Sequence, residues 1–132
     1  PYVTSKWIPG LLTNFGTVSQ RIRELKKLKD MRDNGDFDKY KKKEISKFNK
    51  TIAKLENALG GVQEMSDLPD SIFVIDAVRD NIAVKEANVL NIPVVAFADS
   101  NTDPSNIQYP ITANDDAIKS IKYILSKVAE VL

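Results

Sequence analysis

Apolar residues recur every three or four positions in two successive segments of the first half of the chain. The two series are Phe15, Val18, Ile22, Leu25 and Leu28, then Ile45, Phe48, Ile52, Leu55 and Leu59. Because this spacing places apolar side chains on one face of an α-helix, it predicts helices over residues 13–32 and 41–59. Residues 33–36 (Asp-Asn-Gly-Asp) favour a turn. We therefore expect an antiparallel helical hairpin, with a coiled-coil-like seam in the second helix.

The second half contains two continuous apolar runs, residues 71–76 and 93–99, each ending in an aspartate. Runs without polar alternation are typical of strands that are buried on both faces of a sheet. The segment between them predicts a helix over residues 81–90. The residues of this helix expected to pack on the sheet are Ile82, Ala83, Ala87 and Leu90. A strand, a helix and a strand in so few residues predict a right-handed parallel crossover.

The last third predicts one more strand and one more helix. Residues 107–112 form the strand, and Pro110 within it favours an edge of the sheet. The helix follows a capping pair, Asn114 and Asp115. Its apolar face consists of Ala117, Ile118, Ile121, Ile124, Leu125, Val128 and Leu132. The predicted fold class is therefore α/β, a parallel sheet with flanking helices that carries a protruding antiparallel helical hairpin.

These elements divide the chain into three parts. Residues 1–12 are expected to be the tail of an earlier strand and the turn that leads into the hairpin. Residues 13–61 form the basic hairpin, which Gly60 and Gly61 are expected to end, and residues 62–132 form the α/β domain. Because the chain starts with proline and its sheet is small, we expect it to be a partial chain that lacks an N-terminal part.

The net charge of the chain is +1, but the charged residues are distributed unevenly along it. Residues 1–66 contain 14 Lys and Arg against 8 Asp and Glu, whereas residues 67–132 contain 5 against 10. This division suggests that the hairpin half alone is shaped to meet a polyanion. The chain contains neither cysteine nor histidine, which excludes disulfides, thiolate and imidazole catalysis and nearly all zinc sites. No apolar run approaches the roughly twenty residues that cross a membrane, and no membrane partner is expected.

Four separated segments carry a family resemblance. They are residues 6–15 (KWIPGLLTNF), residues 54–61 (KLENALGG), residues 69–93, and residues 99–104 with 114–117. Within the third, the residues that carry it are Pro69, Ile72, Phe73, Val74, Asp76, Asp80, Val84, Glu86, Asn91, Ile92 and Pro93. At this spacing and in this order, the chain resembles the family of the bacterial-type second protein of the small ribosomal subunit. Pro9 stands where that family usually has a second glycine.

The resemblance implies a partial flavodoxin-like fold with an inserted hairpin, and a structural, non-enzymatic constituent of the small ribosomal subunit. The implied partners are ribosomal RNA and neighbouring ribosomal proteins, including the protein that captures messenger RNA. The implied location is the cytoplasmic ribosome of a bacterium, with an organellar ribosome left open.

Candidate RNA-binding residues follow from the basic hairpin and the segment before it. They are Lys6, Trp7, Asn14, Arg21, Arg23, Lys26, Lys27, Lys42, Lys43, Lys47 and Lys50. Cations in such number neutralise RNA phosphates and displace counterions. The alternatives are a solvated helical face or an arm that binds protein. Trp7 either stacks on a base or anchors the turn before the hairpin, as a buried aromatic does.

Three acids at strand ends suggest a different class of function. Asp76, Asp99 and Asp103 follow the predicted strands, where parallel sheets bind ligands, so a small enzyme that binds Mg²⁺ or a nucleotide is the alternative. The chain has no glycine-rich phosphate loop and no nucleophile paired with a base. We therefore expect these carboxylates to cap loops, and we expect no catalytic residue, metal or cofactor.

Overall fold

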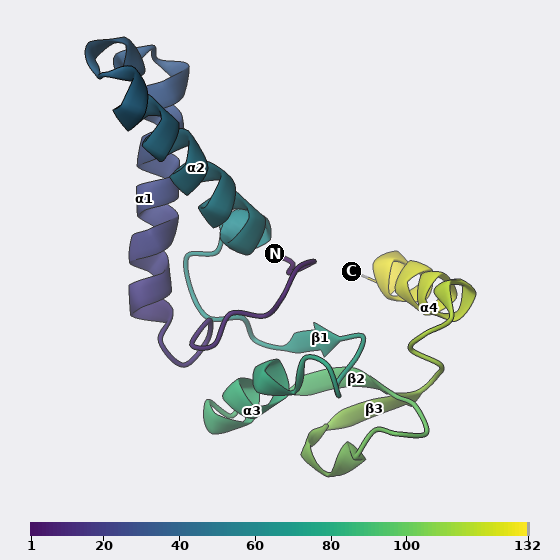
Figure 1. Cartoon of the computed structure of the whole chain (residues 1–132). Coiled ribbons are helices and arrows are strands. Elements are labelled where there is room, and N and C mark those ends of the chain that lie inside the picture. The colour runs from purple at the N-terminus through teal and green to yellow at the C-terminus, as the bar shows by residue number, and fades with distance from the viewer. Residues whose placement is uncertain (132) are drawn as a thin grey trace. The chain divides into compact units, whose positions relative to one another are not determined.

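The chain forms two compact units, residues 1–68 and residues 69–132. The structure is a computed structural model and describes residues 1–131 (Figure 1). None of the helices it describes is long and apolar enough to cross a membrane.

The first unit is a helical hairpin, as the apolar spacing predicts (Figure 1). Helix α1 spans Phe15–Asp33 and helix α2 spans Lys42–Leu59, joined through a short 3-10 helix at Asp36–Lys39. Gly35 adopts a left-handed conformation with φ of 76°, which glycine tolerates without steric cost. The Glu44 carboxylate accepts a hydrogen bond from the Lys41 N–H at 3.1 Å, so it satisfies a backbone donor where α2 begins.

Two apolar clusters hold the hairpin together. The cluster at its base contains Leu11, Val18, Ile22, Leu59 and Val62. The cluster near its tip contains Leu25, Phe37 and Ile52. Leu55 is half-buried and packs against both clusters, so the apolar stripe is continuous along the hairpin.

The two glycines after α2 act differently from the prediction. The helix does end at Leu59, but Gly60 has a right-handed φ of −55° and the chain continues as a 3-10 helix over Gly60–Val62. The need for glycine arises at Gly61, where a Cβ atom would overlap the Tyr2 carbonyl oxygen. The Tyr2 N–H donates to the Gly61 oxygen at 2.9 Å, so this close approach ties the start of the chain to the end of the hairpin.

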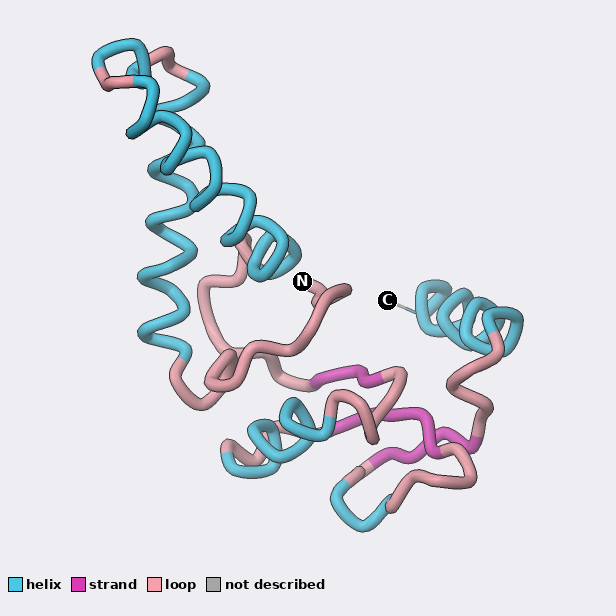
Figure 2. Tube along the Cα trace, in the orientation of Figure 1, coloured by secondary structure: helices cyan, strands magenta, loops and turns pink. Residues whose placement is uncertain are grey.

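The second unit contains a three-stranded parallel sheet in the order β1-β2-β3. Strand β1 spans Ile72–Val74, β2 spans Val94–Ala98 and β3 spans Tyr109–Thr112. Val94 and Ala96 of the central strand are fully buried, whereas β3 is exposed on three of its four residues. The parallel crossover and the position of Pro110 in an edge strand are confirmed. Figure 2 shows the strands of this sheet in magenta.

Helix α3 spans Asn81–Val89 and packs on β1 and β2 with a face that includes Ala83 and Ala87 as predicted but is rotated away from Ile82. Ala83, Val84 and Ala87 are buried, whereas Ile82 is 36% exposed, so the prediction that Ile82 packs on the sheet is wrong. Each residue turns a helix by about 100°, and centring the face on Ala83 and Ala87 brings Val84 inward and leaves Ile82 at the margin. The helix ends through Asn91, which has a φ of 56°, followed by a hydrogen bond from the Ile92 N–H to the Ala87 oxygen.

Helix α4 spans Ile118–Val131 and buries none of its described residues fully. On its apolar face, Ile121 and Ile124 are half-buried, whereas Ile118 is 69% exposed. The Asn114 side chain accepts hydrogen bonds from the N–H groups of Asp116 and Ala117, so it closes the turn before the helix, as predicted for a cap. Leu132, which was expected on this face, lies outside the described residues.

Candidate nucleic-acid interface

Five cations of the hairpin unit are paired with acids. The pairs are Arg21–Glu24 at 3.2 Å, Lys26–Glu64 at 3.3 Å, Lys29–Glu56 at 2.6 Å, Arg32–Asp33 at 2.9 Å and Lys39–Asp36 at 2.6 Å. Four of the five cations come from α1. An acid beside a cation reduces the positive potential that a phosphate would meet, so α1 is less basic at its surface than its composition suggests.

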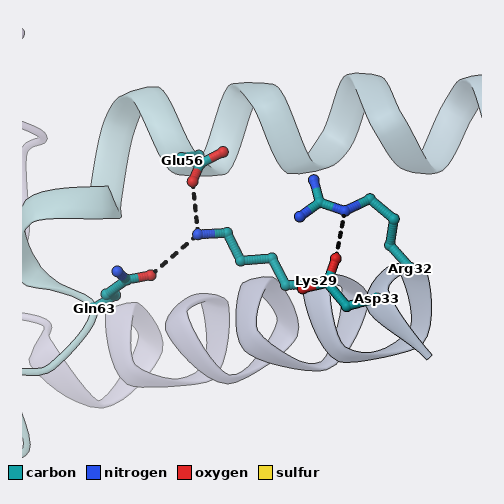
Figure 3. Close-up of polar contacts among 5 residues, drawn as sticks. All are labelled: Lys29, Arg32, Asp33, Glu56 and Gln63. Atoms are coloured by element: carbon teal, nitrogen blue, oxygen red, sulfur yellow. Dashed lines mark hydrogen bonds and ion pairs between the residues drawn. The ribbon is translucent and has the colours of Figure 1, made fainter.

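Lys29 shows how such a cation serves the hairpin itself. Its Nζ lies 2.6 Å from Glu56 Oε1 on the facing helix and donates to Gln63 Oε1 at 3.4 Å (Figure 3). The Lys29 side chain is only 23% exposed. The hydrogen bond from Lys29 lowers the pKa of Glu56, which keeps the carboxylate charged. Lys29 therefore links α1 to α2 and to the segment after it, and it is poorly placed to meet an external ligand.

The cations of α2 are different. Lys42, Lys43, Lys47, Lys50 and Lys54 are all exposed. Within residues 1–131, no acid lies at ion-pair distance from any of these five ammonium groups. Free exposed ammonium groups are what the binding of a polyanion needs, because their field is not cancelled locally.

On α1, Arg23 and Lys27 are also exposed and have no ion-pair partner among the described residues. The structure thus brings seven uncompensated cations onto the two helices. Lys54, which the candidate list lacks, belongs to this set. Its place four residues after Lys50 was the signal that would have found it.

The candidates before the hairpin fall into two kinds. Lys6 and Asn14 are exposed, and Asn14 stands at the N-cap of α1 without capping the helix through its side chain. Trp7 is half-buried and packs against the base cluster. This position favours the anchoring role for the tryptophan over base stacking.

Aromatic residues near the hairpin tip pack against one another. Phe37 is buried and its ring centroid lies 5.3 Å from that of Phe48. Tyr40 contacts the same ring edge-on at 5.2 Å. Phe37 therefore offers no free ring face of the kind that stacks on unpaired bases, whereas Tyr40 is 39% exposed and is held at the tip by its edge contact with Phe48.

The acids at the strand ends in the second unit hold backbone groups. Asp76 accepts hydrogen bonds from the N–H groups of Val78 and Arg79 at 3.1 and 2.8 Å. Asp103 accepts from the backbone and the hydroxyl of Ser105. The predicted role of these carboxylates in capping loops is consistent with these contacts.

Asp99 also caps a loop, and it lies in a cluster that the sequence does not reveal. It accepts from the N–H groups of Ser100 and Asp115, and these backbone donors lower its pKa. Carboxylate oxygens of Asp99, Asp115 and Asp116 lie within 4.8 Å of one another. Burial, and then the negative charges of Asp76, Asp99 and Asp116, raise the pKa of Asp115. The cluster forms because the carboxyl ends of parallel strands meet at one edge of the sheet.

The chain belongs to the ribosomal protein S2 family, whose model matches residues 1–132. It is 49% identical over 132 residues to the small ribosomal subunit protein uS2 of a Nitratiruptor species. That match covers the whole of this chain and 49% of the relative, so the chain spans about half the length of the relative. The family resemblance and the α/β fold class inferred from the sequence are thereby confirmed.

Proposed function

We propose that this chain belongs to a structural, non-enzymatic constituent of the small ribosomal subunit that binds ribosomal RNA through the basic hairpin. The observation that carries the proposal is the group of exposed, uncompensated lysines on α2. Membership of the ribosomal protein S2 family supports it independently. Arg23 and Lys27 on α1 and Lys6 before the hairpin are also exposed and add positive charge to this unit.

The chemistry of this surface suits positioning rather than sequence reading. Lysine is a point charge on a flexible stem, which binds phosphate oxygens without the planar fork that arginine offers to a base edge. Each phosphate neutralised releases condensed counterions, so the affinity falls as salt rises. The hairpin therefore fixes the protein on folded RNA, whatever the base sequence beneath it.

Family membership also supports protein partners and a location. We propose contacts with neighbouring small-subunit proteins, including the protein that captures messenger RNA, in the cytoplasmic ribosome of a bacterium. The small-subunit location is supported by the relative, whose name places it in the small ribosomal subunit, and the partner that captures messenger RNA is proposed from the family resemblance.

RNA binding is tested by titrating small-subunit ribosomal RNA with the chain at several salt concentrations. We expect the logarithm of the affinity to fall linearly with the logarithm of the salt concentration. Binding that is absent at low salt, or that does not respond to salt, would overturn the RNA-binding part of the proposal.

The enzymatic alternative is tested by calorimetric titration with Mg²⁺ and with a nucleotide. We expect no heat of binding, because the carboxylates of Asp76, Asp99 and Asp103 are already engaged by backbone donors. Saturable binding that disappears in Asp99→Ala would favour the enzyme instead.

A further inference from the structure

Four of the free lysines on α2 form a single line. Lys43, Lys47, Lys50 and Lys54 are spaced by four, three and four residues, and all are exposed. At about 100° per residue, this spacing keeps the four side chains within an arc of about 60°. At about 1.5 Å per residue, the line is about 16 Å long. These four residues are called the lysine row below.

We infer that the lysine row is the main RNA contact of the hairpin and that it follows the sugar-phosphate backbone of double-helical RNA. This inference rests on the proposed function and specifies its contact surface and its ligand. A straight row of four charges matches a regularly spaced line of phosphates, whereas a folded pocket for one nucleotide needs groups that converge.

The residues beside the row favour a backbone over unpaired bases. Its neighbours three or four residues away on the helix surface include Ser46, Ala53 and Asn57, which are exposed and small or polar. The one aromatic residue between Lys43 and Lys54 is Phe48, and its ring packs against Phe37 at the tip. Proteins that hold single strands use aromatic platforms for stacking, and the row has none.

The row lies away from the apolar core of the hairpin. The stripe of α2 that faces α1 runs through Ile45, Ile52 and Leu59, and Ile52 and Leu59 are buried. From the helical rotation, the centre of the row lies about 170° round the helix from the centre of that stripe. The lysines therefore project outward, and replacing them leaves the packing of the two helices unchanged.

Helix α1 offers no equivalent surface. Arg21, Lys26 and Arg32 each have an acid within 3.3 Å. Arg23 and Lys27 are left as an isolated pair on one face. The row is thus the longest uninterrupted line of positive charge on the described hairpin, and we assign the RNA backbone to α2 rather than to both helices.

The test compares two quadruple variants of the whole chain. The first, K43Q/K47Q/K50Q/K54Q, neutralises the row. The control, K85Q/K119Q/K122Q/K127Q, removes the same number of lysines from exposed positions of the second unit. The probes are small-subunit ribosomal RNA, an RNA duplex of about twenty base pairs and a poly(U) strand. Circular dichroism checks that each variant keeps its helices.

In the row variant, the affinity for RNA is expected to lose most of its dependence on salt concentration. Each phosphate contact contributes about 0.9 to the slope of log affinity against log salt, so four contacts contribute about 3.6. Between 50 and 200 mM salt, the affinity of the unmodified chain should therefore fall about a hundredfold further than that of the row variant. The control variant should keep a slope within about one of the original. Replacing the four lysines by arginine should preserve binding, because the charges remain.

The outcomes separate this inference from the proposed function. If the unmodified chain binds no RNA, the proposed function fails and the inference fails with it. If the chain binds RNA but the row and control variants weaken it equally, the row is not the contact surface, although RNA binding stands. Stronger binding to poly(U) than to the duplex overturns the assignment to double-helical RNA. Crosslinks from Lys47 to protein rather than to RNA in intact ribosomes assign the row to a protein neighbour instead.

Discussion

The apolar cluster near the tip of the hairpin allows a quantitative prediction about the stability of the hairpin. Leu25 has no exposed surface and packs with Phe37 and Ile52 between the two helices. Replacing Leu25 by alanine removes buried methyl groups and leaves a cavity, while alanine itself suits a helix interior. The hairpin should therefore lose stability through packing alone.

The size of this loss of stability depends on how far the neighbouring side chains can move into the cavity. Fully buried Leu→Ala substitutions cost roughly 2.7–5.0 kcal/mol, and the lower values occur where neighbours move into the cavity. Phe37 lies on the short 3-10 helix after Gly35 rather than on α1 or α2, and we expect it to be the neighbour that moves into the cavity. We therefore expect Leu25→Ala to lower the free energy of unfolding of the first unit by about 3 kcal/mol.

Urea denaturation followed by tryptophan fluorescence measures this change. Trp7 is the only tryptophan, and it packs against the base cluster of the same unit, so its emission reports the unfolding of that unit. Leu55 contacts both clusters and couples the tip to the base. The urea midpoint should fall while the slope of the transition stays constant.

Leu28→Ala is the matched control, because Leu28 stands one turn further along α1 and is only half-buried. Its cost should be less than half that of Leu25→Ala. The packing argument is refuted if the two substitutions cost the same. It is also refuted if Leu25→Ala leaves the Trp7 transition in place, since the tip would then unfold independently of the base.

Three further predictions concern single residues. Gly35→Ala should lower the free energy of unfolding in the same assay by about 1–2 kcal/mol, because alanine pays a steric cost at a φ of 76°; no change would contradict the assigned turn. Lys29→Met should raise the pKa of Glu56 toward its ordinary value, as followed by NMR titration of the Glu56 carboxyl carbon, and an unmoved pKa would show that the pair does not form in solution. Backbone donors lower the pKa of Asp99 in the folded state below its unfolded-state pKa near 3.8. The Asp99 carboxylate therefore stabilises the fold fully at pH values above the unfolded-state pKa, and this stabilisation is lost as the pH falls through the folded-state pKa. Denaturation of the second unit should therefore show a steeper acid limb in the unmodified chain than in Asp99→Asn, and equal limbs would argue against the backbone hydrogen bonds to Asp99.

The helices were predictable from sequence because their signal is periodic over many turns. Both hairpin helices begin and end within about two residues of the predicted bounds, which is the normal uncertainty of helix ends. The strands are shorter than their apolar runs, because hydrogen-bonded pairing extends only over residues 72–74, 94–98 and 109–112. Residues that flank a strand remain apolar when they are packed, so composition alone does not mark where the pairing ends.

Which cations are free was not predictable in the same way. Lys26 pairs with Glu64, 38 residues away, and Lys29 pairs with Glu56 on the other helix. Such pairings depend on the register of the hairpin, which the apolar spacing fixes only approximately. The lysine row, by contrast, is predictable from the sequence, because lysines spaced three and four residues apart in a helix lie on one face.

The positions of the acids decide where the hairpin is basic, although they contribute little to its stability. Exposed ion pairs are generally worth about 0–1 kcal/mol each, whereas burial of the apolar stripe holds the helices together. Acids such as Glu24 and Glu64 cancel the charge of nearby α1 cations, and the lysine row on α2 has no such partner within the described residues. The apolar stripe and the lysine row lie on nearly opposite faces of α2. A substitution in the row therefore leaves the packing of the stripe undisturbed. The binding strength of the hairpin is therefore adjustable by single Lys-to-Gln or Lys-to-Glu changes in the row, with the fold of the hairpin preserved.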